Sequence, residues 1–199
     1  MISTNRHIKA LLRRTGTARS RDFVVAGITR SQLSRMAAAG QLVRVARGLY
    51  AMPDYQSGEH GALVAVVKRA PGVVFCLLTA LRIHDLTTQA PFEVWIAIGN
   101  KDHPPRLDYP PLRTVRFSDA ALAAGVETRR IDGAKMRVTS VAKTVADCFK
   151  FRNKIGLDVA LEALREARRA KKASADDLWR YAKINRVTNV MRPYLEAVA

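Results

Sequence analysis

Residues 28–53 read ITRSQLSRMAAAGQLVRVARGLYAMP, and this stretch decides the fold of the N-terminal region. Thr29 and Gln32 stand three positions apart at the start of an amphipathic run, which is the spacing of a capping box at a helix N-terminus. An apolar stripe follows at helical spacing, and Gly40 is placed to end the helix. The predicted stripe consists of Leu33, Met36 and Ala37.

The periodicity changes after this helix. Residues 42–47 alternate in steps of two, and Gly48 separates them from a second short run, LYAMP. A pattern of period two that is interrupted by glycine predicts a β-hairpin. Because Arg44 and Arg47 lie on the hairpin, it resembles the wing of a winged helix-turn-helix domain.

Two short helices are predicted upstream. Residues 5–13 have one apolar face, and Gly16 and Thr17 break this helix. The segment SRDFVVAG predicts a second helix, which Ser20 caps and Gly27 ends in a left-handed conformation. The predicted core residues of the two helices are Ile8, Leu11, Leu12, Phe23, Val24 and Val25.

The charge of the chain favours a polyanionic partner. Lysine and arginine number 34 against 17 acidic residues, a formal charge of +17, and residues 1–50 contain ten basic side chains and the single acid Asp22. Nucleic acid and anionic membrane surfaces both fit such a charge. No apolar run is long enough to span a membrane, and no signal-peptide core is present. We therefore expect a cytoplasmic protein that binds double-stranded DNA and no membrane.

The predicted DNA-binding residues form three groups. One is the exposed face of the helix after Thr29, which would read base edges in the major groove. The second is the wing, and the third clamps phosphates. A helical domain with a basic surface that never contacts DNA remains the alternative. The three groups are Arg30, Ser31, Gln32, Ser34 and Arg35, of which Gln32 is also needed for capping; Arg44 and Arg47; and Arg6, Arg19 and Arg21.

The polar segment DYQSGEH, residues 54–60, predicts a boundary between a DNA-binding domain over 1–55 and a second domain over 56–199. In the second domain we expect a helix that Ser57 caps and Pro71 ends, then a buried helix over 75–83. The predicted fold class is α+β: a winged helix-turn-helix followed by a mixed domain that ends in several helices. The predicted strands are PFEVWIAIG, PLRTVRF, VETRRI and KMRVT, and the later helices include SVAKTVADCFKF, LDVALEALREARRA, ASADDLWRYAKIN and NVMRPYLEAVA.

The sequence indicates no catalytic, metal or cofactor site. Cys76 and Cys148 lie in apolar surroundings and are expected to be buried free thiols. A nuclease reading fails because no acid is followed two positions later by lysine, and P-loop and dinucleotide fingerprints are absent. His84 beside Asp85 is expected to be packed or capping rather than catalytic. We expect Trp95 and Trp179 to pack in the core.

Across nearly its whole length the chain resembles the AbiEi family, the antitoxin and repressor components of bacterial abortive-infection toxin–antitoxin pairs of type IV. The matching pieces, in order, are VRVARGLYAMP, LLTALRIHDLTTQAPFEVWIAI and RVTSVAKTVADCF. Where the family commonly has Ser-Ala-Leu and His-Gly-Leu, this chain has Thr79-Ala80-Leu81 and His84-Asp85-Leu86. Asp85 can adopt a positive φ more readily than most residues but cannot replace a glycine that makes a close contact.

The resemblance implies a function in phage defence with two activities. The N-terminal domain would bind inverted repeats in the promoter of its own operon and repress transcription. The C-terminal domain would counter a cognate nucleotidyltransferase-like toxin, in some systems without a stable complex. The sequence itself identifies neither the operator nor the toxin.

A second basic run lies over residues 150–172 and allows other functions. It is interpreted first as a solvated helix face with ion pairs between residues three or four apart. It could instead dock an acidic toxin directly, which would make the chain an interaction module whose DNA binding is secondary and non-specific, or it could extend the DNA footprint. The residues of such a docking surface would be Arg165, Arg168, Arg169, Lys171 and Lys172.

Overall fold

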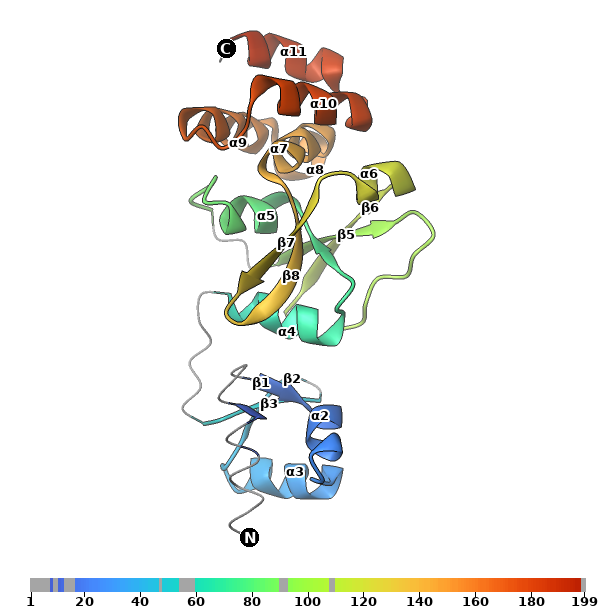
Figure 1. The fold of residues 1–199 in the computed structure, drawn as a ribbon, viewed down its shortest axis with the longest axis vertical. Coiled ribbons are helices and arrows are strands. Elements are labelled where there is room, and N and C mark those ends of the chain that lie inside the picture. Colours follow the sequence, from blue (N-terminus) through green and yellow to red (C-terminus); the bar gives the residue numbers. More distant parts are fainter. Residues whose placement is uncertain are drawn as a thin grey trace. The chain divides into compact units, whose positions relative to one another are not determined.

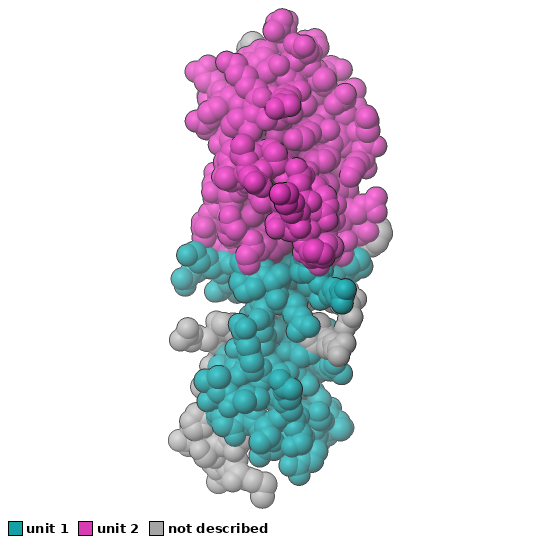
Figure 2. All heavy atoms as spheres, turned by 90° about the vertical axis from the view of Figure 1, so that its right-hand side faces the viewer, with its two compact units in different colours: residues 1–71, 105–111, 130–135 teal, residues 72–104, 112–129, 136–199 magenta. Residues whose placement is uncertain are grey.

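The computed structural model of the chain contains two compact units, which Figure 2 colours separately. Unit 1 comprises residues 1–71, 105–111 and 130–135, and unit 2 comprises residues 72–104, 112–129 and 136–199. The structure describes residues 8, 11–12, 17–46, 48–53, 60–89, 93–107 and 110–197.

Unit 1 contains a helix-turn-helix and a three-stranded antiparallel sheet (Figure 1). The sheet order is β1-β3-β2. Strands β2 and β3 form the hairpin, and β1, which precedes both helices in the sequence, pairs with the other edge of β3. The helix-turn-helix and the hairpin confirm the N-terminal part of the predicted fold. The elements are β1 (Thr17–Arg19), α2 (Ser20–Val25), α3 (Arg30–Ala38), β2 (Val43–Ala46) and β3 (Leu49–Ala51).

Strand β1 is missing from the sequence prediction, which gave Thr17 only the role of a helix breaker. Thr17 instead pairs with Ala51, and Arg19 pairs with Leu49. Three residues are too few to show a period of two, so nothing local indicated the strand. Its partner is more than 25 residues away, and the pairing depends on the tertiary structure.

The prediction that Ser20 caps helix α2 is wrong. Ser20 is the first residue of the helix, and its Oγ donates to the carbonyl oxygen of Gly48 at 3.3 Å. Arg19 occupies the N-cap position, and its backbone N–H donates to Oδ2 of Asp22 at 2.9 Å. The serine hydroxyl therefore ties the helix to the hairpin turn.

The predicted core of helix α2 is only partly correct. Phe23 is buried and meets Tyr50 edge-on with ring centroids 6.1 Å apart, but Val24 and Val25 are 47% and 90% exposed. A helix of six residues covers one narrow face, so a single large side chain reaches the core. In the first predicted helix, the described residues 8, 11 and 12 are helical, with Ile8 and Leu12 buried.

Helix α4 (Gly61–Arg69) closes unit 1. It ends before Pro71, as expected, whereas Ser57 lies outside the described residues. The ammonium group of Lys68 donates to both the carbonyl oxygen and, at 2.6 Å, the hydroxyl of Thr17. Unit 1 therefore continues to Pro71, and the domain boundary after residue 55 stays a prediction.

A mixed five-stranded sheet of order β6-β5-β4-β8-β7 lies in unit 2, except that residues 130–135, at the turn between β7 and β8, belong to unit 1. Strands β5 and β6 are parallel, β4 is antiparallel to β5, and β4 is parallel to β8. The predicted helix over 75–83 begins late, because Phe75 belongs to a strand that pairs with Ile96 and Val138. The strands are β4 (Val74–Phe75), β5 (Val94–Gly99), β6 (Leu112–Phe117), β7 (Val126–Ile131) and β8 (Ala134–Thr139).

Helices follow the sheet in unit 2, as the sequence predicted (Figure 1). Helix α7 lies at their centre and packs against α5, α9 and α10. Both cysteines are buried and free, and Trp95 is buried in the same core, as expected. The helices are α5 (Leu77–Ile83), α6 (Asp119–Ala123), α7 (Val141–Lys150), α8 (Arg152–Ile155), α9 (Leu157–Arg169), α10 (Ala175–Asn185) and α11 (Thr188–Ala197).

The residues of Thr79–Leu86 that differ from or match the family pattern have structural roles at the end of helix α5. The Thr79 hydroxyl accepts the backbone N–H of Trp95 at 2.8 Å, and Nε2 of His84 donates to the carbonyl oxygen of Thr139 at 2.6 Å. Asp85 has φ +53°, and its carboxylate points to solvent, 91% exposed. The position thus requires the left-handed backbone that the aspartate was expected to tolerate, and nothing crowds its side chain.

Unit 2 also buries an ion pair inside helix α7. The ammonium group of Lys143 pairs with Oδ1 of Asp147, which also accepts the Asn185 amide at 2.7 Å. The two charged side chains are 1% and 0% exposed. Burial raises the pKa of Asp147 above its ordinary value, although Lys143 and Asn185 act to lower it. The pair holds α7 to α10 through Asn185.

Candidate nucleic-acid interface

Helix α3 begins with the capping box that the sequence predicted. The backbone N–H of Gln32 donates to Thr29 Oγ1 at 3.3 Å, and that of Thr29 donates to Oε1 of Gln32 at 2.8 Å. Leu33 is buried, and Gly40 ends the helix with φ +69°. Because both ends are fixed, the opposite face is held in one orientation.

That opposite face is polar and solvent-exposed. Arg30, Ser31, Ser34 and Arg35 are all exposed, whereas the oxygen of Gln32 is used by the cap. Arg30, Ser34 and Arg35 can therefore reach outward, whereas the Ser31 hydroxyl lies 3.0 Å from Thr29 Oγ1 and shares a hydrogen bond with it. Gln32 keeps only its amide NH₂ for any other contact.

Arg44 lies on strand β2 next to an irregularity in the pairing of the hairpin strands. The register between β2 and β3 shifts between Arg44 and Ala46, and Gly48 turns with φ +74°. Arg44 is exposed, whereas Arg47 lies outside the described residues. A bulge next to the turn increases local twist and directs the neighbouring side chains outward.

Arg19 and Arg21 flank the start of helix α2. Arg21 is exposed and lies 3.6 Å from Asp22, whereas the Arg19 side chain is half-buried. Burial lowers the pKa of Arg19, and the neighbouring charges of Arg21 and Arg69 lower it further against the attraction of Asp22. No described residue hydrogen-bonds the buried Nη2 of Arg19. Arg6 lies outside the described residues.

A hollow of about 530 Å³ in unit 1 brings several predicted residues together. Its lining residues come from strand β1, helices α2, α3 and α4, and the hairpin. No carboxylate is among its described lining residues, so its charge is strongly positive. Ser31, Gln32 and Arg35 do not line it. The lining consists of Arg19, Ser20, Arg21, Arg30, Leu33, Ser34, Arg44, Gly48, Tyr50 and Arg69.

Arg69 is a member of this hollow that the sequence analysis missed. It lies in the last turn of helix α4, beyond the polar segment 54–60 that was taken as a boundary. Nothing in the local sequence distinguishes it from any other basic residue at a helix C-terminus. The contact of Lys68 with Thr17 is what places it.

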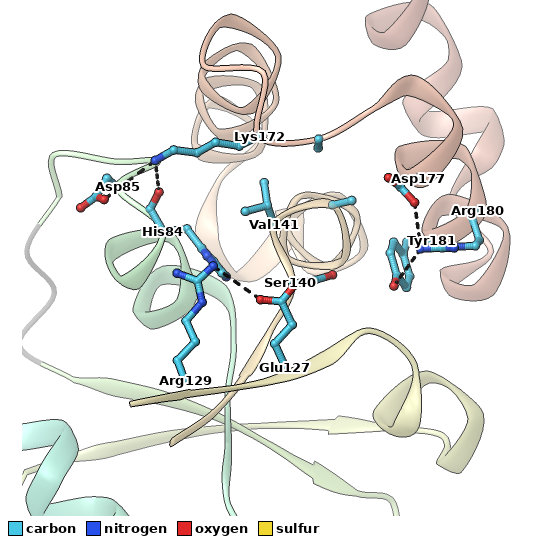
Figure 3. A pocket seen from close by; sticks show the side chains of 12 residues that line it. His84, Asp85, Glu127, Arg129, Ser140, Val141, Lys172, Asp177, Arg180 and Tyr181 are labelled. Atoms are coloured by element: carbon cyan, nitrogen blue, oxygen red, sulfur yellow. Dashed lines mark hydrogen bonds and ion pairs between the residues drawn. The ribbon is translucent and has the colours of Figure 1, made fainter. Parts of the chain in front are cut away.

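A second hollow, of about 520 Å³, lies in unit 2 (Figure 3). Its basic side chains already have acidic partners: Arg129 pairs with Glu127 and Arg180 with Asp177. Lys172 donates to the carbonyl oxygen of His84 and lies near Asp85. This hollow is polar but balanced in charge. It should therefore attract a polyanion less strongly than the hollow of unit 1 does.

The basic run 150–172 is largely committed to contacts within unit 2. Arg169 pairs with Glu166 at 2.6 Å, and Arg168 donates to the carbonyl oxygen of Ala173 at 3.5 Å. Lys172 makes the contacts described above. The predicted ion pairing along a solvated helix face is confirmed for Arg169 and Glu166.

Two kinds of feature are absent from the described part of the chain. It contains no group of three or more histidine, cysteine, aspartate or glutamate residues arranged to hold a metal ion. None of its helices has the length and apolar character required to cross a bilayer.

Comparison with known proteins finds a family similarity for the N-terminal region. Residues 6–53 match the family model described as transcriptional regulator, AbiEi antitoxin, which confirms the resemblance for that region. A crystal structure of the RV2827C protein from Mycobacterium tuberculosis has a similar fold, with a TM-score of 0.67 and 14% identity over 98% of this chain and 80% of that one. No curated protein matches the chain. The matched family is one of regulators and antitoxins, not a class of enzymes.

Proposed function

We propose that the chain is an antitoxin that binds the promoter of its own operon through unit 1 and represses transcription. The observation that carries this proposal is the surface of unit 1. There the exposed face of helix α3 adjoins a hollow lined by five arginines and no acid. The family match over residues 6–53, the segment that includes this helix and hairpin, supports the same function.

The side chains of the interface divide into two roles. Arg35 and Ser31 lie on the exposed face of α3 but outside the hollow, which suits them to base edges in the major groove. Arg44 on the hairpin and Arg19 and Arg21 near β1 are suited to phosphates, which position the protein without reading sequence.

The operator and the partner follow from the resemblance and not from the geometry. We propose inverted repeats in the promoter as the operator and a nucleotidyltransferase-like enzyme as the toxin. Residues 1–55 would be the minimal DNA-binding domain, and residues 56–199 would be needed to counter the toxin.

The contacts in unit 2 argue against direct docking of a toxin by the basic run. Arg168, Arg169 and Lys172 make contacts within the unit, so a partner would have to displace those contacts. In unit 1 five arginines line the hollow without a carboxylate among the lining residues, and the neighbouring Asp22 lies 3.6 Å from Arg21, so a polyanion would compete there with one acid for five guanidinium groups. DNA binding is therefore the better supported function.

A mobility-shift titration tests the proposal. The full protein would be titrated on DNA from upstream of its own gene and on an unrelated fragment of equal length, at about 150 mM salt, because affinity depends steeply on salt. We expect a preference of about 10³-fold for the upstream fragment. Equal binding to both fragments would contradict the proposal.

Two arginine variants would separate the two roles. Arg35→Ala should reduce the preference for the upstream fragment by about 1 to 3 kcal/mol if the side chain reads a base. Arg44→Ala should weaken binding to both fragments alike and make the salt dependence shallower by about one unit of slope. An unchanged slope for Arg44→Ala would remove the wing from the interface.

A further inference from the structure

The hollow of unit 1 contains a polar group that lacks a partner. Nη2 of Arg19 is buried, and no described residue hydrogen-bonds it. A buried guanidinium donor without an acceptor is costly, and several further arginines surround it. An anion in the hollow would bind the part of the Arg19 side chain that lines it and would reduce the repulsion among these cations.

Arg69 lies close to the hairpin turn. Its Nη1 is 4.0 Å from the position that a Cβ on Gly48 would occupy, and Oγ of Ser20 is 3.4 Å from the same point. The guanidinium of Arg69 therefore extends from the end of helix α4 to the turn of the wing. The same turn is held to helix α2 by the bond from Ser20 to the carbonyl oxygen of Gly48.

Lys68 accounts for this placement. Its ammonium group donates to the carbonyl oxygen and the hydroxyl of Thr17, so it anchors the last turn of α4 to strand β1. Arg69 is the next residue and Arg19 is the last residue of that strand. The anchor therefore brings two guanidinium groups, from segments 50 residues apart, to one hollow.

We propose that Arg19 and Arg69 hold one backbone phosphate of the bound duplex in this hollow, so that helix α4 belongs to the DNA interface. This inference rests on the proposed function. Two forked guanidinium groups suit a phosphodiester because each can donate a pair of parallel hydrogen bonds to its oxygens. A phosphate held in this way carries no sequence information, so the contact should contribute affinity and not sequence preference. Arg69 lies beyond the family match, which ends at residue 53.

The test compares Arg69→Ala with Arg192→Ala in the full protein. Arg192 is exposed on helix α11, outside both basic runs, and its loss changes the net charge equally. Binding to the upstream and unrelated fragments would be titrated over a series of salt concentrations. For Arg69→Ala we expect the slope of log K against log salt to fall by about 0.9 on both fragments, with the preference between them unchanged. Arg192→Ala should leave the slope as in the wild type.

The outcomes separate this inference from the proposed function. If the wild type prefers the upstream fragment and Arg69→Ala behaves as Arg192→Ala does, the phosphate site is wrong and the proposed function stands. If the wild type binds both fragments equally and Arg69→Ala still lowers the slope, the phosphate site is supported and the proposed binding to the promoter is contradicted. If Arg69→Ala changes the preference, Arg69 reads sequence and the phosphate assignment is wrong. A protein that binds neither fragment would overturn both.

Discussion

The two units use their basic residues in opposite ways. In unit 1 five arginines line one hollow without a carboxylate among them, and a guanidinium nitrogen of Arg19 lacks a partner. In unit 2 the basic side chains of the corresponding hollow have acidic partners, and Lys143 is buried with Asp147. In the proposed function the positive charge of unit 1 serves binding, whereas the cations of unit 2 serve contacts within that unit.

The comparison shows why the net charge of the chain was informative without being specific. A total of +17 says only that cations exceed acids. The acids are distributed unevenly, since Asp22 is the single acid in residues 1–50. Whether a basic side chain is available to a partner depends on the acids close to it in the folded structure. The net charge of the chain does not contain this information.

The largest expected effect concerns the buried pair of unit 2. Lys143→Met leaves Asp147 in the core without its counter-charge and should destabilise unit 2 by about 3 to 5 kcal/mol. Trp95 and Trp179 both lie in unit 2, so tryptophan fluorescence during urea unfolding follows this unit.

The control for Lys143→Met is Glu127→Ala, which removes the exposed pair between Glu127 and Arg129. It should cost between about 0 and 1 kcal/mol, because exposed pairs are screened by solvent. Equal losses in the two variants would mean that burial does not distinguish the pairs.

A smaller effect is expected at the start of helix α3. Thr29→Ala removes the acceptor of the Gln32 N–H and should destabilise helix α3 by about 1 kcal/mol. Hydrogen exchange of the α3 backbone amides would measure this loss.

Ser118→Ala provides the matched control for Thr29→Ala. Ser118 is the N-cap residue of helix α6, but its side chain makes no capping bond. We expect almost no change in the exchange of the α6 amides. A similar acceleration in both helices would show that the capping bond of Thr29 contributes nothing.

The smallest effect is a dependence on pH in unit 1. Burial lowers the pKa of Lys68 to about 8, whereas the unfolded chain keeps it near its ordinary value of about 10.4. Between these values the unfolded state binds the extra proton, so the unfolding free energy of unit 1 should rise with pH. The effect is small because much of the side chain still meets water.

Calorimetric unfolding of the wild type and Lys68→Met at pH values from about 7.5 to 10 would test this dependence. The stability of the wild type should increase relative to the variant as the pH rises, because the variant has no group that titrates at this position. Parallel curves would mean that Lys68 keeps its ordinary pKa in the folded protein.

Local patterns in the sequence were sufficient for several features. The capping box at Thr29, the left-handed turn at Gly40 and the hairpin after it depend on residues within a few positions of one another. The longer strands and helices of unit 2, such as β5, β6, α7 and α9, followed for the same reason, since each shows its own period, whereas the short elements β4, α6 and α8 were not predicted. Asp85 was expected to tolerate a positive φ, and it adopts one.

Only the tertiary structure decided what depends on distant partners. Strand β1 exists because Thr17 pairs with Ala51. Ser20 does not cap helix α2, because its hydroxyl donates to the carbonyl oxygen of the distant Gly48. Arg69 joins the arginines of unit 1 because Lys68 reaches back to Thr17. A sequence fixes the periodicity and the charge of each segment through neighbouring residues, but residues 50 positions apart meet only when the whole unit has folded.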